Sequence, residues 1–342
     1  MSEHDQPASG QHSPARRDVL RSALALLASG AAAPVWLGPV MAQAYPARSI
    51  QVIVPFAAGG GVDVVTRIVA EAAGDILKQR LVIDNRGGAG TVIGSQAVAK
   101  AEADGYTLLA APTTMVINPA LRANLPFDWE KDLVPVAMMA KLPFVVVTRK
   151  DHPANTMKEL EVWGKKDGQI ITFGSGGAGT VAHLAGEFFG LRSGAKVQHV
   201  PYRGEAPALT DAMSGNITVM FSTLASASAQ VAGGTLKALA VTTKTRASLL
   251  PNVPTVAEQG YPDYDLSAWV AIVAPRNTST EVVRVLNSAI NAALAQPAIA
   301  ERLATIGAQA APGTPDQLAA FMKADAAIWS RVVKEAGIKI DP

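Results

Sequence analysis

Short runs of β-branched and other apolar residues alternate along the chain with segments whose apolar residues recur at helical spacing. The first pair is clear: residues 50–55 predict a strand, and residues 63–78 carry their apolar side chains on one helical face. This alternation predicts an α/β fold with largely parallel sheets. Further strands are expected at 81–83, 106–110, 144–148, 169–173, 196–200, 217–221, 236–241 and 268–274, and further helices at 93–100, 158–166, 180–189, 207–214, 279–294 and 315–335.

Two similar strand, glycine-loop and helix units, one near the start and one near the middle, suggest two lobes. The two amphipathic helices at the end of the chain need a sheet to cover, so the simplest arrangement returns the chain to the first lobe after residue 269. We therefore expect residues 45–146 and 270–342 to form domain 1 and residues 147–269 to form domain 2. The chain would cross between the lobes twice, which predicts a hinge.

The first 44 residues read as an export signal. A polar leader ends in Arg16-Arg17, an apolar stretch follows, and Ala42-Gln43-Ala44 supplies a cleavage pattern before Tyr45. The paired arginines resemble a twin-arginine signal. Val19 stands where such signals usually carry Phe, so the general secretory route stays open. We expect cleavage near Ala44/Tyr45 and a periplasmic mature chain; a retained membrane anchor is disfavoured because glycine and proline interrupt the short stretch.

Composition narrows the function classes. The chain has 342 residues, a net charge of +2, 5% aromatic residues and no cysteine. The small charge and the few aromatic residues argue against nucleic-acid binding. The lack of cysteine excludes disulfides, thiolate nucleophiles and Cys-ligated metals.

The most informative element is the run Pro55-Phe56-Ala57-Ala58-Gly59-Gly60-Gly61-Val62-Asp63, which ends a predicted strand and opens a helix. Glycines let a ligand approach backbone amides, and a helix N-terminus favours an anion without any Lys or Arg. Asp63 suits an N-cap or first-turn role that satisfies loop amides. An ordinary strand–helix turn has the same pattern, so one such loop is weak evidence.

A second glycine loop, residues 174–179, also precedes a helix, with Thr180 and His183 just after it. Two helix ends, one per lobe, that face a common cleft would hold a small anion from both sides. His183 is either a ligand contact or a buried, hydrogen-bonded histidine. Arg203, which follows another strand, is either a partner for a carboxylate or a surface arginine.

The second loop also matches G-x-G-x-x-G through Gly174, Gly176 and Gly179. Dinucleotide sites need an acidic residue at the end of the next strand, and none occurs here before Glu205, so that interpretation is disfavoured. The chain has no G-x-S-x-G, H-E-x-x-H or P-loop motif. The helical pair His183 and Glu187 has no apparent third metal ligand. We expect no catalytic activity, no cofactor and no metal.

Several runs along the chain form a joint pattern: Pro55-Phe56…Gly59-Gly60…Asp63, Asp84-Asn85-Arg86…Gly88-Ala89-Gly90…Ile93-Gly94, Asp104-Gly105-Tyr106-Thr107-Leu108, Gly179-Thr180…His183-Leu184, Val200-Pro201-Tyr202-Arg203-Gly204…Pro207-Ala208-Leu209, Val253-Pro254-Thr255-Val256-Ala257-Glu258…Gly260, Trp269 and Ala274-Pro275. Taken together, these motifs resemble those of the Bug-type receptors of tripartite tricarboxylate transporters. The resemblance extends over essentially the whole mature chain.

The resemblance implies a two-lobed periplasmic-binding-protein fold, type II-like, with a central ligand cleft and two hinge crossings. It also implies that backbone amides and waters of both glycine loops hold a ligand carboxylate; family ligands are citrate-like acids, acidic amino acids, nicotinate and aromatic acids. Carried over by position, the ligand-binding residues are Phe56, Gly59, Gly60 and Asp63 in the first lobe, Ser175, Gly176, Thr180, His183, Tyr202 and Arg203 in the second, and Thr113 and Thr114 at the border of the cleft.

The resemblance predicts a monomeric periplasmic receptor that captures a small carboxylate for the membrane permease subunits of a tripartite transporter. Three alternatives stay open: a sensor receptor for a two-component kinase, an exported enzyme that binds a nucleotide or phosphate, and an interaction protein with a vestigial cleft. Ala58 and Gly87 replace prolines usual in the family, and Ser222 stands where the family often has Asp. The exact ligand therefore does not transfer.

Overall fold

Two sheets that share one long strand organise residues 45–338, which the computed structural model describes. The export-signal prediction, residues 1–44, lies outside them. The first-lobe sheet has the order β2–β1–β3–β9–β4, with β10 also on β4, and the second-lobe sheet has β8–β4–β7–β5–β6. The strands are β1 (Ile50–Val54), β2 (Leu81–Asn85), β3 (Thr107–Pro112), β4 (Leu133–Arg149), β5 (Ile171–Ser175), β6 (Val197–Pro201), β7 (Val219–Thr223), β8 (Leu236–Val241), β9 (Ser267–Pro275) and β10 (Gln309–Ala310).

Both sheets are mixed, so the expectation of largely parallel sheets is wrong in part. β1 is parallel to β2 and β3, and β5 is parallel to β6 and β7, as strand–helix–strand units require. β4 and β9 are antiparallel to each other, because one takes the chain out of the first lobe and the other brings it back. The sequence pattern does not predict the first half of β4, where Pro135 and Pro143 interrupt the apolar run.

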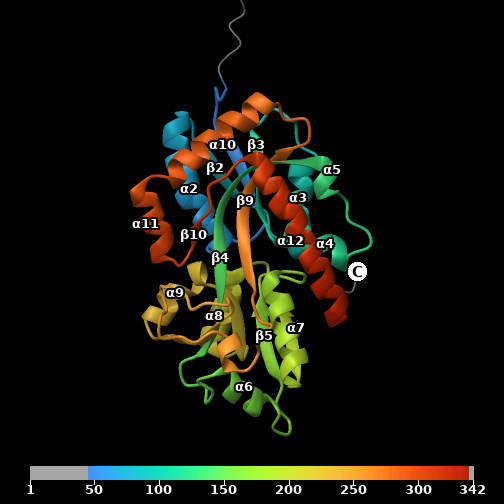
Figure 1. Ribbon diagram of the computed structural model, residues 1–342, viewed down its shortest axis with the longest axis vertical. Coiled ribbons are helices and arrows are strands. Elements are labelled where there is room, and N and C mark those ends of the chain that lie inside the picture. Colours follow the sequence, from blue (N-terminus) through green and yellow to red (C-terminus); the bar gives the residue numbers. More distant parts are fainter. Residues whose placement is uncertain (1–44, 339–342) are drawn as a thin grey trace, which may run out of the picture. The chain divides into compact units, whose positions relative to one another are not determined.

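The crossing between the lobes has a defined position on β4. Pro143 pairs with β9 of the first lobe, and the next residue, Phe144, pairs with β7 of the second. The returning chain passes beside this point, since the N–H of Thr242 donates to the carbonyl of Phe144 and the N–H of Leu266 donates to that of Thr242. Figure 1 shows β4 and β9 running side by side between the lobes. The strands change sheet a few residues before the predicted domain boundaries at 146/147 and 269/270; the division into domains itself stays a prediction.

Helices cover both sheets. The first lobe holds α2 (Gly61–Leu77), η1 (Ala89–Thr91), α3 (Val92–Ala99), α4 (Thr114–Leu121), α5 (Trp129–Asp132), α10 (Thr280–Leu294), α11 (Pro297–Thr305) and α12 (Pro315–Ala336). The second holds α6 (Met157–Gly164), α7 (Val181–Ser193), α8 (Glu205–Ser214), α9 (Leu224–Ala232) and η2 (Ala257–Gln259). The sequence pattern does not predict α4, α5, α9 and α11, which are short.

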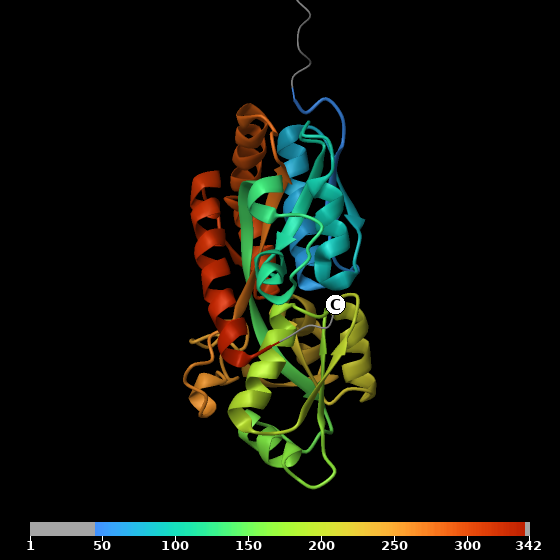
Figure 2. The same ribbon diagram turned by 90° about the vertical axis from the view of Figure 1, so that its right-hand side faces the viewer.

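Side-chain caps explain where several helices begin. Thr156, Thr180 and Ser279 accept hydrogen bonds from first-turn amides of α6, α7 and α10. Thr314 and Gln317 form a reciprocal capping box on α12. Helix α12 lies along one side of the molecule and packs against α4 and α7, so it contacts both lobes (Figure 2).

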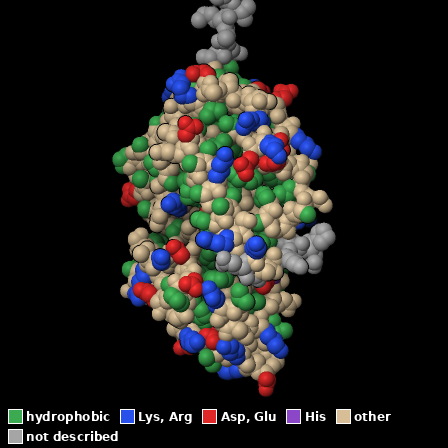
Figure 3. All heavy atoms as spheres, turned by 45° about the vertical axis from the view of Figure 1, so that its right-hand side comes forward, with side chains coloured by type: hydrophobic (Ala, Val, Ile, Leu, Met, Phe, Trp, Pro, Cys, Tyr) green, Lys and Arg blue, Asp and Glu red, His purple; other side chains and the backbone are tan. Residues whose placement is uncertain are grey.

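The hydrophobic core continues through both lobes. The two faces of β4 serve different parts of it: Val146 joins the main cluster, and Val145 and Val147 join a second cluster with α8 and α9. Within residues 45–338, no helix has the length and apolar character to span a bilayer. On the face shown in Figure 3, Lys and Arg are interspersed with Asp and Glu, in line with the small net charge.

A buried carboxylate fixes α6 in the second lobe. Glu161 accepts hydrogen bonds from Lys158 and Lys165, each at 2.6 Å, and from the hydroxyl of Tyr261 at 2.7 Å. Burial by itself would raise the pKa of Glu161, but these three donors outweigh it and lower the pKa to about 2. The ionised carboxylate is therefore favoured by the fold.

We expect the Glu161 network to make the protein sensitive to acid. A folded-state pKa below the unfolded value of 4.5 adds stability that is complete above pH 4.5 and is lost as the pH falls toward 2. Melting temperatures measured between pH 7 and pH 2.5 should therefore fall less steeply in Glu161→Gln than in the wild type. Parallel curves for the two proteins would contradict this expectation.

Candidate functional site

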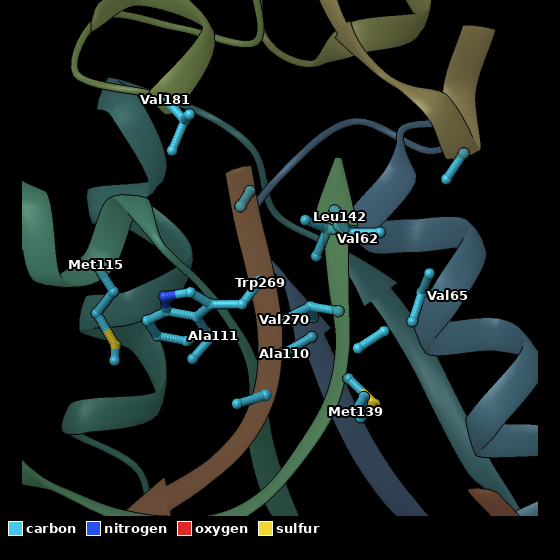
Figure 4. Packing of buried hydrophobic residues seen from close by; sticks show 14 of the residues in the cluster. Val62, Val65, Ala110, Ala111, Met115, Met139, Leu142, Val181, Trp269 and Val270 are labelled. Atoms are coloured by element: carbon cyan, nitrogen blue, oxygen red, sulfur yellow. The ribbon is translucent and has the colours of Figure 1, made fainter. Parts of the chain in front are cut away.

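A cavity of about 40 Å³ lies between the two lobes. This is room for roughly three water-sized groups, so the lobes are close together. Figure 4 shows Val62 of α2 and Leu142 of β4 next to each other on its first-lobe side, with Val181 of α7 across from them. The lining residues are Phe56, Gly60, Gly61, Val62, Pro112, Thr113, Thr114, Leu142, Phe144, Gly176, Thr180, Val181, Ala182, Glu205, Thr223 and Ala268.

Five helices begin at the wall of this cavity. Their N-caps are Gly60 for α2, Thr113 for α4, Thr180 for α7, Gly204 for α8 and Thr223 for α9. The first N–H groups of a helix have no partner inside it, and each helix N-terminus carries partial positive charge. None of the lining residues in the described part of the chain is Lys or Arg. The arrangement therefore favours an anion through backbone groups.

The loops at the helix starts touch across the cleft. The N–H of Ala57 in the first lobe donates to the carbonyl of Arg203 in the second at 3.0 Å. The N–H of Gly61 donates to the carboxylate of Glu205 at 3.3 Å. Gly87 also lies against this contact, because a Cβ there would be 2.9 Å from the Arg203 carbonyl oxygen. A side chain at position 87 would hold the lobes apart.

Gly61 has even less room. A Cβ at this position would overlap the side chain of Thr223 in the other lobe. The neighbouring Gly60 is different, because its Cβ would be 3.7 Å from Glu205, an ordinary contact distance. The close approach of α2 to α9 thus depends on the missing side chain of Gly61.

Asp63 shapes the first glycine loop from within. Its buried carboxylate accepts hydrogen bonds from the N–H of Gly59, the amide of Asn85 and the guanidinium of Arg67. Burial acts to raise the pKa of Asp63, but these donors together lower it. Gly59 has a φ of +85°, which the glycine adopts without strain. The loop is thus held in place by a carboxylate that lies outside the cavity.

A stacked histidine pair supports the second glycine loop. The rings of His183 and His199 are 4.0 Å apart between centroids. The N–H of Gly179 donates to Nδ1 of His183 at 3.1 Å, and Oγ of Ser175 lies 2.6 Å from Nε2 of His199. Oγ of Ser175 also contacts both backbone groups of Gly177. Ser175, His183 and His199 therefore fix the backbone of the loop.

Burial lowers the pKa of His199 to about 3, and the neighbouring His183 adds to the shift. Because Nδ1 of His183 accepts a hydrogen bond, the neutral form of this ring carries its proton on Nε2, 3.7 Å from Glu187. Two stacked imidazolium rings would repel each other, so the pair is stable when His199 is neutral.

Tyr202 and Arg203 lie on the outer side of the loops. The hydroxyl of Tyr202 donates to Asp211 at 2.6 Å, and burial together with this carboxylate raises the pKa of Tyr202. Arg203 is exposed; both residues line an open groove that also contains Arg122 and the loop 87–90. Arg203 is thus a surface arginine in this conformation, and only its carbonyl takes part in closing the cleft.

Comparison with known proteins shows which protein family the chain belongs to. The family model described as "Tripartite tricarboxylate transporter family receptor" matches residues 65–338. The chain belongs to this receptor family. Protein BugT of Bordetella pertussis is 38% identical over 304 residues, which cover 88% of this chain and 93% of BugT.

Two solved structures of related proteins have the same fold. The periplasmic binding protein BugD superposes with a TM-score of 0.84 at 33% identity and covers 86% of this chain and 99% of its own. The R. palustris protein Rpa4515, solved with adipate, superposes with a TM-score of 0.84 at 32% identity, with the same coverage. The predicted two-lobed periplasmic-binding-protein fold is confirmed.

The receptor cleft brings together half of the residues predicted to bind the ligand. Those that line the cavity are Phe56, Gly60, Thr113, Thr114, Gly176 and Thr180. Those that lie outside its lining are Gly59, Asp63, Ser175, His183, Tyr202 and Arg203. Thr113 also joins β3 to β9, since its hydroxyl accepts from the N–H of Trp269 at 2.8 Å.

Sequence reasoning missed Glu205 and Thr223 as lining residues, together with the apolar wall. Glu205 had a local signal, because it follows Gly204 at a strand-to-helix turn like the other loops. Thr223 had none, since α9 is not predicted. Leu142, Phe144 and Ala268 line the cavity only because β4 crosses between the lobes there and β9 begins beside the crossing.

We expect Gly61→Ala to weaken closure of the cleft. The added methyl group meets Thr223, and overpacking of this kind costs about 1–3 kcal/mol, so the closed form should lose roughly tenfold in population. Hydrogen exchange at the amide of Ala57, which is protected only when the lobes meet, should speed up by about the same factor. Gly60→Ala is the matched control and should leave the rate unchanged; equal rates in all three proteins would contradict the assignment.

We expect His199 to stay neutral well below pH 6. The unfolded chain takes up a proton near pH 6.5 and the folded chain near pH 3, so stability falls as the pH falls between these values, by at most about 1.4 kcal/mol per pH unit. NMR titration of the imidazole signals, assigned with His199→Gln, measures the midpoint. A midpoint near 6.5 would show that burial and His183 do not act on this ring as described.

Proposed function

We propose that this protein is a periplasmic receptor for a small carboxylate, which it closes between its lobes. The observation that carries the proposal is the set of helix N-termini from both lobes around one cavity whose lining contains no Lys or Arg. A carboxylate can bind at such backbone donors from either lobe. Binding from both sides at once favours the closed form by mass action.

The lining residues divide into polar and apolar contributors. In this proposal, Thr114 and Thr180 and the first-turn amides of α4 and α7 meet the carboxylate. Phe56, Val62 and Phe144 contact the carbon skeleton of the ligand. The predicted ligand-binding residues that lie outside the cavity lining hold the loops in place instead. Asp63 and His183 are the clearest examples.

The related protein Rpa4515 was solved with adipate, which supports a carboxylate as ligand here. The family description supports delivery to the membrane permease of a tripartite transporter. We propose that the mature receptor starts near Tyr45 after removal of the leader, acts as a monomer and has no catalytic activity. Delivery to a sensor kinase is the alternative that shares the same cleft.

The surroundings of Gly174 argue against the alternative that the second glycine loop binds a dinucleotide. This glycine belongs to β5, and a Cβ there would lie 2.5 Å from Ile217, 3.3 Å from Ala208 and 3.5 Å from Tyr202. The missing side chain therefore serves packing inside the second lobe. A dinucleotide site would use this first glycine for the tight turn after the strand, whereas Gly174 is itself part of the strand.

Thermal unfolding of the chain from residue 45, which forms a compact unit, tests the receptor function. Small mono-, di- and tricarboxylates and nucleotides are compared. A carboxylate at 100 times its Kd adds about 2.7 kcal/mol of stability and should raise the melting temperature by several degrees, whereas nucleotides should not. A shift with nucleotides only, or native mass spectra without any bound small acid, would contradict the proposal.

A further inference from the structure

Glu205 is the one charged side chain in the lining of the cavity within the described residues. It is the first residue of α8 and belongs to the second lobe. The cleft of a carboxylate receptor is an unexpected place for a carboxylate of the protein, because two like charges repel strongly where little water separates them. Its contacts explain how the fold accommodates it.

Four hydrogen-bond donors surround the Glu205 carboxylate. The N–H of Thr223 donates at 3.2 Å, the hydroxyl of Thr223 at 2.6 Å, and the hydroxyl of Ser226 also donates. The fourth donor is the N–H of Gly61 in the first lobe, at 3.3 Å. The side chain thus occupies the N-termini of α9 and α2 together, and it spans the two lobes.

A ligand carboxylate then has to use the other helix starts. α4 and α7 present Thr114 and Thr180 to the cavity. The rest of the ligand then lies beside the negative charge of Glu205 in the same small cavity, and the lining provides no Lys or Arg to neutralise a second anion. A hydroxyl or ammonium group placed there would instead donate a hydrogen bond to Glu205.

We infer that Glu205 makes the cleft selective for ligands with a single carboxylate and a neutral or cationic donor at the far end. Dicarboxylates such as the adipate bound to Rpa4515 are disfavoured by charge repulsion. The inference rests on the proposed carboxylate receptor and specifies which carboxylates that receptor takes. Ser222 stands where the family often has Asp, but position 222 is not part of the cavity lining. The charge that selects the ligand is therefore the one at position 205.

Isothermal titration of the protein with matched ligands tests the selectivity. The probes are succinate, glutarate and adipate, each compared with the ω-hydroxy and ω-amino monocarboxylates of the same chain length. Wild-type protein should bind the best monocarboxylate at least about tenfold more tightly than its dicarboxylate partner. Glu205→Gln keeps the size of the side chain and an acceptor oxygen, and it should reduce this ratio at least about tenfold, mainly by improving dicarboxylate binding.

Glu281→Gln is the matched control. Glu281 also lies in the first turn of a helix and pairs with Arg284 at the exposed surface. Its replacement by Gln changes the net charge by the same amount as Glu205→Gln. It should leave the ratio unchanged, and melting curves show whether each variant is folded.

Tighter binding of dicarboxylates by the wild type, or the same ratio in Glu205→Gln, would overturn the selectivity and leave the carboxylate receptor intact. Failure of every probe to bind either folded protein would overturn both.

Discussion

The convergence of helix N-termini on the cleft is the constraint on which the rest of the site depends. The first N–H groups of a helix have no partner inside it, so these helix starts favour an anion although the lining has no basic side chain. Such donors are fixed by the backbone and cannot rearrange as a lysine can. The loops that hold them must therefore be rigid, and Asp63 in one lobe and the Ser175–His199 pair in the other supply that rigidity with their hydrogen bonds.

Helix starts from both lobes can converge on one cleft only if the lobes are joined at a fixed point, and the strands between the lobes supply that point. β4 continues directly from one sheet to the other, and β9 begins beside the point where β4 changes partner, so the two lobes meet at a defined position on paired strands. Helix starts that line the cavity lie on both sides of this point. Small side chains at the contact, above all Gly61, let the two sets of helix starts approach each other.

Glu205 shows that a receptor cleft has properties beyond the family pattern. The side chain accepts hydrogen bonds at the N-termini of α2 and α9, and it places a negative charge in the lining of the cavity. Family membership predicts a carboxylate at the backbone donors, whereas the charge at position 205 determines what the far end of that ligand carries. The two statements concern different parts of the cavity.

Much of this follows from the sequence, for reasons that are local. Period-two and helical patterns depend on neighbours in the chain, so most strands and the long helices were predictable, as were the two glycine loops that begin α2 and α7; the first half of β4 and the short β10 were not. Phe56, Gly60 and Thr180 lie where the motifs put them. The tertiary structure alone decided that β4 runs on through two prolines, and that Asp63 and His183 turn away from the cavity to hold their loops. It also decided that Glu205 meets Gly61, 144 residues away in sequence, because contacts across the cleft depend on how two sheets are placed and no local pattern records that placement.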